Sequence, residues 1–135
     1  MSRLTVIIER SENNFSAYIK GVDGIAATGR TVDEIKQSIC EAIAEFVSSC
    51  KDLGREVPEE ISGSPEITFE IDIQSLLTIY EGIFTKSGLE RLTGINQKQL
   101  WHYAKGKSRP RQEQRRKLES ALHRLGSELL SLSFS

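Results

Sequence analysis

The chain has 135 residues, a formal net charge of -1 at neutral pH and 38% hydrophobic residues, a composition typical of one ordinary domain or two small ones. No apolar run approaches the ~20 residues that a membrane-spanning helix needs, since Arg3, Glu9 and Arg10 interrupt the apolar stretch near the N-terminus. That stretch also lacks the layout of a secretory signal, so the sequence predicts a cytoplasmic protein without a membrane partner.

The small net charge hides an uneven distribution along the chain. Residues 1–70 carry seven basic and thirteen acidic side chains, a net charge of -6. Residues 71–135 carry eleven basic and six acidic ones, a net charge of +5. An acidic half followed by a basic half predicts two partners of different charge.

The first residues of the chain predict a small sheet. Residues 4–10 (LTVIIER) are rich in β-branched side chains, and residues 15–20 alternate apolar and polar ones, as two strands joined by a turn at 13–14 would. The glycines at positions 21 and 24 predict a loop, which leads to a short third strand over residues 25–28.

A helix and a last strand complete the predicted first domain. Residues 31–34 (TVDE) form a capping box, in which the threonine hydroxyl accepts a backbone N–H and the glutamate reaches back. Apolar residues then recur every three or four positions over 32–50, which predicts one amphipathic helix. A loop over 51–65 and a strand over 66–71 follow. We therefore expect an antiparallel β-β-β-α-β sheet with one helix over one face, which ends at residue 71.

Two cysteines, Cys40 and Cys50, lie ten residues apart in this predicted helix. At ~1.5 Å of rise per residue they would be ~15 Å apart, which is too far for a disulfide bond. Their spacing does not match a zinc site either. We therefore expect both to be small apolar residues on the buried face of the helix.

From Asp72, a residue type suited to a helix N-cap, the sequence predicts only helices. The predicted helices begin at Ile73, cover 86–93 and 97–105, and run from 112 to about 125, where a leucine repeat continues past Gly126: Leu118, Leu122, Leu125, Leu129 and Leu132. The predicted second domain is all-α and covers residues 72–135.

The most informative segment is residues 87–110, SGLERLTGINQKQLWHYAKGKSRP. Gly94 tolerates a positive φ at the end of one short helix, and Asn96 is suited to cap the next. Three apolar residues are expected in the small core: Ile95, Leu100 and Tyr103. Two short helices joined by a glycine turn are typical of a helix-turn-helix, whose second helix enters the DNA major groove.

The polar side chains of that second helix predict its contacts with DNA. Glutamine pairs with adenine and lysine donates to guanine, so the expected base contacts are Gln97, Lys98, Trp101 and His102. The expected phosphate contacts flank them: Asn96, Lys105, Lys107, Arg109 and Arg111. Residues 97–117 hold eight basic side chains and one acidic one, with Arg115, Arg116 and Lys117 extending the charge. Such clustering supplies the salt-dependent part of DNA affinity.

Other roles are open for several of these residues. A basic run after a helix is usually only a solvated face, and Trp101 suits a core or a protein interface as well as a base contact. Neither His102 nor His123 has a catalytic or metal-binding partner nearby in the sequence, so a structural role is expected for His123 on the polar side of the last helix.

Residues 85–110 resemble the helix-turn-helix of the XRE/Cro family, whose pattern is T-G-[IV]-[SN]-Q-x-x-[LI]-x-x-[YW]-x-x-G-K-x-x-P. The chain carries this pattern as Thr93-Gly94-Ile95-Asn96-Gln97, Leu100, Tyr103, Gly106-Lys107 and Pro110. It departs from the family at Glu90, where a small residue is usual, and this departure concerns the packing between the helices. The resemblance implies binding to double-stranded operator DNA.

The first half resembles the HicB antitoxin family, in which a β-hairpin and a glycine-containing loop precede G-x-T-[VP]-x-E. Here that pattern reads Gly29-Arg30-Thr31-Val32-Asp33-Glu34, with Ile39 and Glu41-Ala42-Ile43 following in the helix. The resemblance covers about residues 3–50 and the strand near 66–71. It implies an α+β fold, in which a pared-down RNase H-like domain precedes the all-α helix-turn-helix domain.

The same resemblance implies a function for each half. HicB proteins neutralise HicA, a small ribonuclease toxin, with the N-terminal domain, and they repress their own operon with the C-terminal domain as homodimers or higher homo-oligomers. The acidic first half fits a basic RNA-cleaving partner, because complementary potentials speed association. We expect no cofactor and no metal ion.

Two further functions are compatible with these features, and a third, catalysis by a nuclease, is disfavoured. A stand-alone repressor without a toxin partner would have the same sequence, and so would an interaction module whose leucines only assemble oligomers. A nuclease would need carboxylates that converge on Mg²⁺, and the available ones are explained by capping, turn and surface roles: Glu9, Asp23, Asp33, Glu34 and Glu70. Without a Ser/His/Asp set, a P-loop or a nucleotide fingerprint, the sequence predicts no catalytic residue.

Overall fold

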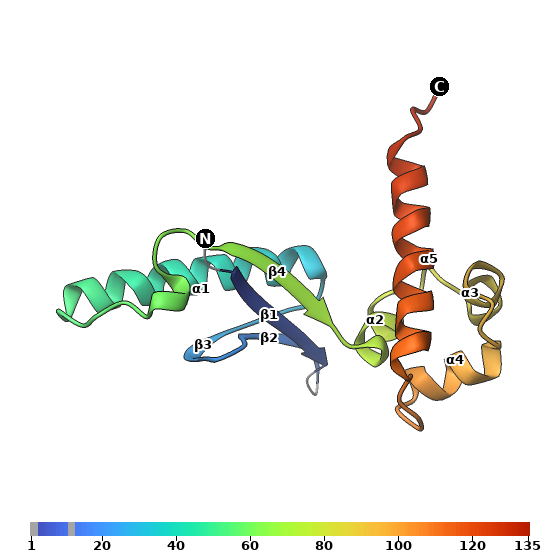
Figure 1. Cartoon of the computed structure of the whole chain (residues 1–135), viewed down its shortest axis with the longest axis horizontal. Coiled ribbons are helices and arrows are strands. Elements are labelled where there is room, and N and C mark those ends of the chain that lie inside the picture. The colour runs from blue at the N-terminus through green and yellow to red at the C-terminus, as the bar shows by residue number, and fades with distance from the viewer. Residues whose placement is uncertain (1–2, 11–12) are drawn as a thin grey trace. The chain divides into compact units, whose positions relative to one another are not determined.

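The computed structural model describes residues 3–10 and 13–135 of an α+β protein (Figure 1). The chain divides into two compact units, Met1–Ser75 and Leu76–Ser135, which we call the sheet unit and the helical unit. The division falls inside helix α2 (Ile73–Ile79), four residues after the predicted domain boundary. Within the described residues, no helix has both the length and the apolar character needed to cross a membrane.

The sheet unit contains four strands in the order β3-β2-β1-β4. Their bounds are Arg3–Arg10 for β1, Phe15–Ile19 for β2, Val22–Gly29 for β3 and Glu66–Ile71 for β4. Successive hairpins make β1, β2 and β3 antiparallel. The predicted antiparallel sheet is wrong for β4, which pairs parallel to β1. A helix joins β3 to β4 and carries the chain back along the sheet, so β4 enters from the same end as β1.

The third strand is longer than predicted. The turn after β2 is confined to Lys20 and Gly21, and Gly21 has a φ of +81°. Gly24, with a φ of +89°, lies within β3 instead of in a loop. The register between β2 and β3 shifts at Tyr18 and Ile19. This irregularity lets β3 begin directly after the turn and include Gly24.

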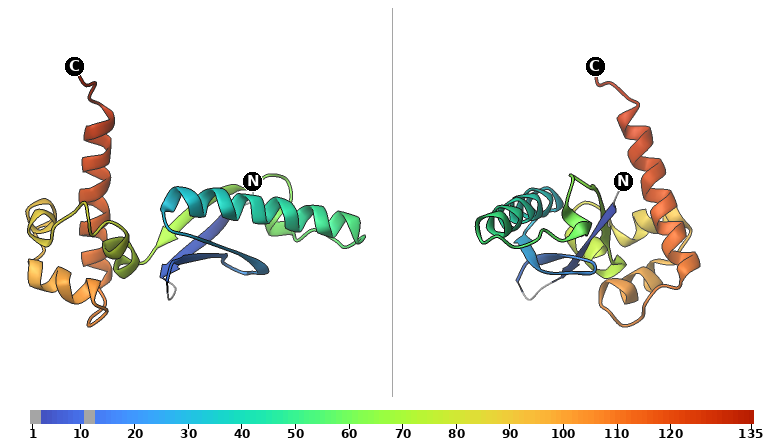
Figure 2. Two further views of the ribbon diagram at one scale, coloured as in Figure 1. Left: turned by 180° about the vertical axis from the view of Figure 1, so that it is seen from behind. Right: turned by 60° about the vertical axis from the view of Figure 1, so that its left-hand side comes forward.

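Helix α1 (Val32–Asp52) covers one face of the sheet (Figure 2). The threonine half of the predicted capping box is confirmed, since the Glu34 N–H donates to Thr31 Oγ1 at 3.1 Å. The Glu34 carboxylate accepts the N–H of Arg30 at 2.8 Å, one residue further back than the capping residue. Ile35 and Ile39 are fully buried against the sheet, as the periodicity predicts.

The prediction that both cysteines are buried is wrong for Cys40, which is exposed, and confirmed for Cys50. Ten helical positions rotate a side chain by about 1000°, which leaves the two cysteines roughly 80° apart around the axis. The buried stripe of α1 is too narrow to include both.

The core of the sheet unit lies between α1 and the sheet. Its fully buried strand residues include Leu4, Val6, Ile8 and Ile19. The predicted loop over 51–65 contains a short 3₁₀ helix, η1 (Glu59–Ile61), because Ile61 is buried against this core. Since neighbouring residues of a strand point to opposite faces, the other face of the sheet carries a different set: Thr5, Ile7, Glu9, Ser16, Tyr18, Thr68 and Glu70.

The helical unit contains the end of α2 and helices α3 (Lys86–Thr93), α4 (Gln97–Ala104) and α5 (Gln112–Leu130). At the start of α2, the Asp72 carboxylate accepts the N–H of Ser75 at 3.0 Å and its hydroxyl at 2.6 Å, which confirms the predicted N-cap. Helix α5 runs five residues beyond Leu125. The buried residues of this unit come from every helix and from the turn before α4: Leu77, Leu89, Ile95, Leu100, Tyr103, Leu118 and Ala121.

Candidate nucleic-acid interface

The turn between α3 and α4 has the geometry that the glycine predicts. Gly94 ends α3 with a φ of +78°, and its N–H donates to the Glu90 carbonyl at 2.8 Å. The Thr93 hydroxyl donates to the Leu89 carbonyl at 2.7 Å and accepts the N–H of Ile95 at 3.1 Å. Ile95 is buried, as expected for the residue that fills the corner. These bonds hold α4 at a defined angle to α3.

Two side chains cap the start of α4. Asn96 Oδ1 accepts the N–H of Lys98 at 2.8 Å, so its predicted N-cap role is confirmed. Glu90 Oε1 accepts the N–H of Gln97 at 2.9 Å. This second cap explains the departure from the XRE/Cro pattern, because a small residue at position 90 has no acceptor to offer. An acidic residue near a helix N-terminus also stabilises the helix dipole.

We expect Glu90→Ala to lower the stability of the helical unit by about 0.5–2 kcal/mol, because the Gln97 N–H loses its acceptor. Urea unfolding followed by the fluorescence of Trp101, the one tryptophan in the chain, measures this loss. Glu90→Gln keeps an acceptor oxygen and is the control, with a smaller expected loss. Equal stability of Glu90→Ala and the wild type would contradict the capping role.

Helix α4 divides its side chains between the core and the surface. Leu100 and Tyr103 are buried, as predicted, while Gln97, Lys98 and Trp101 are exposed. His102 is only half-buried, and its ring centre lies 5.5 Å from that of Trp101. The structure therefore places three of the four predicted base-contact residues on the exposed side of α4, with His102 at the edge.

Gln99 differs from Gln97, although both are glutamines of the same helix. Its Nε2 donates to the Ser108 hydroxyl at 3.1 Å, and its side chain is half-buried. Gln99 therefore holds the segment after α4 in place, whereas the side chain of Gln97 extends into solvent.

The end of α4 folds back on itself. Gly106 has a φ of +73°, and its N–H donates to the Tyr103 carbonyl at 3.2 Å, while the Lys107 N–H donates to the His102 carbonyl at 2.9 Å. This pair of bonds is a Schellman motif, which needs a left-handed residue at the glycine position. Lys107 Nζ lies 4.4 Å from the centre of the Trp101 ring. Sequence reasoning assigned Lys107 to phosphate and did not anticipate this contact.

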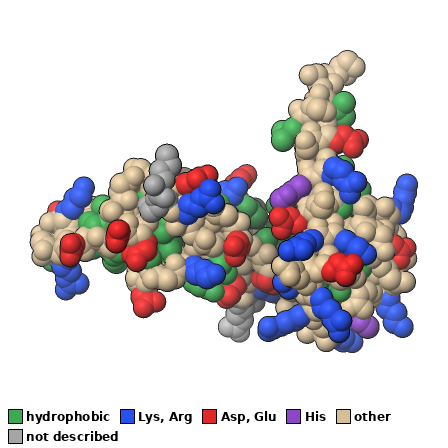
Figure 3. Space-filling model, viewed as in Figure 1, with side chains coloured by type: hydrophobic (Ala, Val, Ile, Leu, Met, Phe, Trp, Pro, Cys, Tyr) green, Lys and Arg blue, Asp and Glu red, His purple; other side chains and the backbone are tan. Residues whose placement is uncertain are grey.

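The five residues predicted to contact phosphate are all exposed: Asn96, Lys105, Lys107, Arg109 and Arg111. Asn96 uses its carbonyl oxygen for capping, which leaves its amide nitrogen for another contact. No basic side chain over 98–117 forms an ion pair with a carboxylate of the described residues. Lys and Arg side chains gather over the lower part of the helical unit in Figure 3, where Figure 1 places α4 and the start of α5. These side chains are therefore free of ion pairs with the carboxylates of the described residues.

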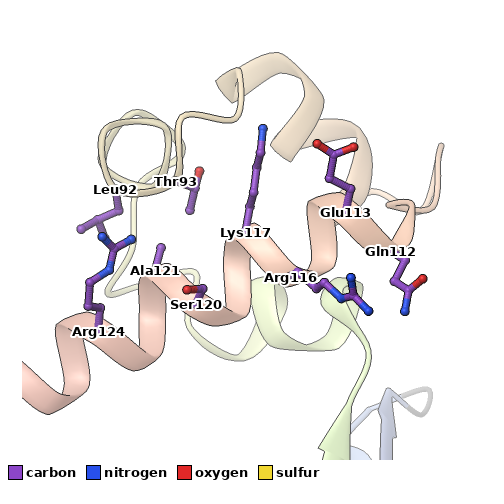
Figure 4. Close-up of a pocket in the computed structure, with 9 residues that line it drawn as sticks. All are labelled: Leu92, Thr93, Gln112, Glu113, Arg116, Lys117, Ser120, Ala121 and Arg124. Atoms are coloured by element: carbon purple, nitrogen blue, oxygen red, sulfur yellow. The ribbon is translucent and has the colours of Figure 1, made fainter.

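The basic residues after Arg111 have other surroundings. Arg115 Nη1 donates to the Pro110 carbonyl at 2.9 Å. Arg116, Lys117 and Arg124 line a groove of about 550 Å³ between α3 and α5, together with Leu92, Thr93, Gln112, Glu113, Ser120 and Ala121. In Figure 4, Lys117 extends from α5 toward the segment that joins α3 to α4. Arg116 and Lys117 therefore face this groove, while Arg115 bonds to the backbone just before α5.

Two of the five carboxylates considered for a nuclease site, Glu9 and Glu34, have structural partners. Glu34 caps α1, and Glu9 Oε1 accepts the hydroxyl of Tyr18 at 3.0 Å. This hydrogen bond, with the nearby negative charge, raises the pKa of Tyr18 above its ordinary value, because both favour the protonated phenol. In the part of the chain that the structure describes, no three His, Cys, Asp or Glu side chains are grouped closely enough to hold a metal ion.

No family model matches the chain, and neither a curated protein nor a solved structure gave a significant match to it. The resemblances to the XRE/Cro and HicB families therefore rest on the motif residues themselves.

Proposed function

We propose that this protein is a transcriptional regulator that binds double-stranded operator DNA with α4. The observation that carries the proposal is the arrangement of α4 after the Gly94 turn. Leu100 and Tyr103 anchor one side of the helix in the core, and the opposite side presents Gln97, Lys98 and Trp101 to solvent. An α-helix fits the DNA major groove, which is about 12 Å wide. A second helix presented in this way is how helix-turn-helix proteins read bases.

The charge of the same region supports the proposal. Cations around α4 lack carboxylate partners among the described residues, so they are available to phosphates. In this assignment Gln97 pairs with adenine and Lys98 donates to guanine, while Trp101 and His102 complete the base contacts. The phosphate contacts are Asn96, Lys105, Lys107, Arg109 and Arg111, which fix the register of the protein on the duplex.

Titration of the full chain against its own upstream DNA and against a scrambled duplex tests this function. Tighter binding to the upstream duplex, with an affinity that falls as salt rises, supports an autoregulatory repressor. Equal binding to both duplexes, or no binding to either, would contradict it.

A pair of glutamine substitutions tests whether the exposed side of α4 reads the bases. We compare binding to the operator with binding to a duplex in which the adenine is replaced by another base. Gln97→Ala should lower this discrimination by about 1–3 kcal/mol, because a bidentate pair is lost. Gln99→Ala is the matched control, since Gln99 bonds to Ser108 instead of facing solvent. Gel-shift titrations with both duplexes provide the measurement. If Gln97→Ala leaves the discrimination intact, α4 does not read DNA through this residue.

For the sheet unit we propose the binding of a basic protein, in the manner of an antitoxin that neutralises a HicA-type ribonuclease. The sheet face opposite α1 supports this, because it carries Tyr18, 40% exposed, together with Glu9 and Glu70. Residues 1–70 have a net charge of -6, which attracts a positively charged partner. Binding of the protein encoded next to this chain, lost when Glu9 and Glu70 are changed to lysine, supports an antitoxin. No binding favours a stand-alone repressor.

Helix α5 supports a proposal of homodimers or higher homo-oligomers. Leu118 of α5 is buried, whereas four apolar residues at its end and just beyond it are exposed: Leu129 51%, Leu130 89%, Leu132 55% and Phe134 88%. Adjacent exposed apolar side chains are typical of a protein–protein contact. A dimer through α5 would place two α4 helices on successive turns of one duplex, about 34 Å apart. An oligomerisation module without DNA binding would use the same contact and would differ in showing no salt-dependent binding to DNA.

A further inference from the structure

Trp101 is a large apolar side chain on the exposed side of a helix, and 40% of it is accessible to solvent. It follows Gln97 by four residues, so both lie on the same side of α4, one helical turn apart. The core of the helical unit leaves this ring at the surface and takes Leu100 and Tyr103 instead. Trp101 therefore faces whatever contacts the exposed side of α4.

The ring of Trp101 is held by its neighbours. The Schellman motif at Gly106 folds Lys107 back along α4, so that its Nζ lies 4.4 Å from the ring centre. This distance suits a cation–π interaction, which favours one orientation of the indole. His102 lies next to the ring as well, with its ring centre at 5.5 Å and an interplanar angle of 58°. The exposed part of Trp101 is thus presented in a defined position.

An apolar ring in the major groove has one apolar group to contact. Base edges in that groove present hydrogen-bond donors and acceptors, except for the 5-methyl group of thymine. Stacking on a base is excluded on the ring face that Lys107 covers, and the bases of a duplex are already stacked on one another. The remaining apolar contact is between the indole and a thymine methyl group.

We propose that Trp101 reads the 5-methyl group of a thymine in the operator, and that Lys107 is the positioning residue that holds its ring for this contact. This inference rests on the proposed DNA-binding function and specifies one base, a thymine, that the operator must contain. Four residues advance α4 by about 6 Å, and base pairs repeat every 3.4 Å, so the thymine lies about two base pairs from the adenine that Gln97 reads.

Deoxyuridine tests this contact, because it lacks only the methyl group of thymidine. The full chain is first used to select a binding duplex from a random-sequence pool, and each thymidine of that duplex is then replaced by deoxyuridine in turn. We expect one replacement to weaken binding about fourfold, the effect of one buried methyl group. With Trp101→Ala, the same replacement should have no effect. A hydrogen bond from the indole N–H to thymine O4 would survive in deoxyuridine, so undiminished binding at every position overturns the proposal.

Two lysine variants test the positioning role. Lys107→Gln should bring the thymidine-to-deoxyuridine affinity ratio from about four toward one and change the emission of Trp101 in the free protein. Lys107→Arg keeps a cation over the ring and should restore the ratio. Lys105→Gln is the matched control, because it removes an exposed charge at the same helix end and should weaken both duplexes equally. If Lys107→Gln also weakens both equally, Lys107 acts only as a phosphate contact and the positioning role is wrong.

The outcomes separate the two proposals. If no sequence emerges from the selection, the DNA-binding function itself is contradicted. If a sequence emerges and Trp101→Ala retains the full effect of deoxyuridine, the function stands and the thymine contact is wrong.

Discussion

Substitution of Leu100 by alanine is expected to lower the free energy of unfolding of the helical unit by about 2–5 kcal/mol. Leu100 is fully buried on the inner side of α4, and alanine there leaves a cavity in the core. A unit of about 60 residues buries little apolar surface, so a loss of this size is most of its stability. DNA binding should disappear with the folded unit, although Leu100 itself faces away from solvent.

The measurement uses the position of the one tryptophan. Trp101 fluorescence reports urea unfolding of the helical unit, while far-ultraviolet circular dichroism also follows the sheet unit. Leu100→Met, which conserves volume, is the control and should cost less than about 1.5 kcal/mol. Unchanged stability of Leu100→Ala would show that Leu100 does not anchor α4. Loss of both units in a single transition would show that they do not unfold independently.

The affinity for DNA is expected to fall about 100-fold for each bound copy of the chain between 50 and 200 mM salt. Each neutralised phosphate contributes about -0.9 to the slope of log affinity against log salt, so four cations around α4 give a slope of about -3.6. These are Lys105, Lys107, Arg109 and Arg111, none of which pairs with a carboxylate of the described residues. Two copies on one duplex would double the slope, and sedimentation of the complex gives the number bound.

Two substitutions calibrate this slope. Arg109→Gln should reduce it by about 0.9, because one phosphate contact is removed. Lys51→Gln removes an exposed lysine from the sheet unit and should leave the slope unchanged. A slope near zero for the wild type would contradict phosphate binding and favour the oligomerisation module instead.

Much of the fold was predictable because its signals are local. The capping box at Thr31, the N-caps at Asp72 and Asn96 and the glycine turn at Gly94 each depend on residues within one helical turn. The same holds for the alternation in β1 and the helical periodicity in α1. Hydrogen bonding and burial over such short distances leave a pattern in the order of the residues, so the sequence predicts these elements and their bounds closely.

The features that sequence reasoning missed depend on residues that meet only in the folded chain. The parallel pairing of β4 follows from the path of α1 across the sheet, and the burial of Ile61 depends on strands more than forty residues away. Glu90 reaches Gln97 because the turn at Gly94 brings the end of α3 beside the start of α4. Arg116 and Lys117 continue the basic run in sequence, but they line a groove between α3 and α5.

The sequence by itself determined that the chain holds an α+β half and an all-α half, and that α4 has one apolar and one polar side. It also determined which residues are candidates for contact with DNA, because residue type and helical period decide those points. Only the tertiary structure decided that Gln97 faces solvent while Gln99 bonds to Ser108, and that Lys107 lies over Trp101. Identical residue types take different roles there, because a side chain's role depends on which atoms the fold brings within a few ångströms of it.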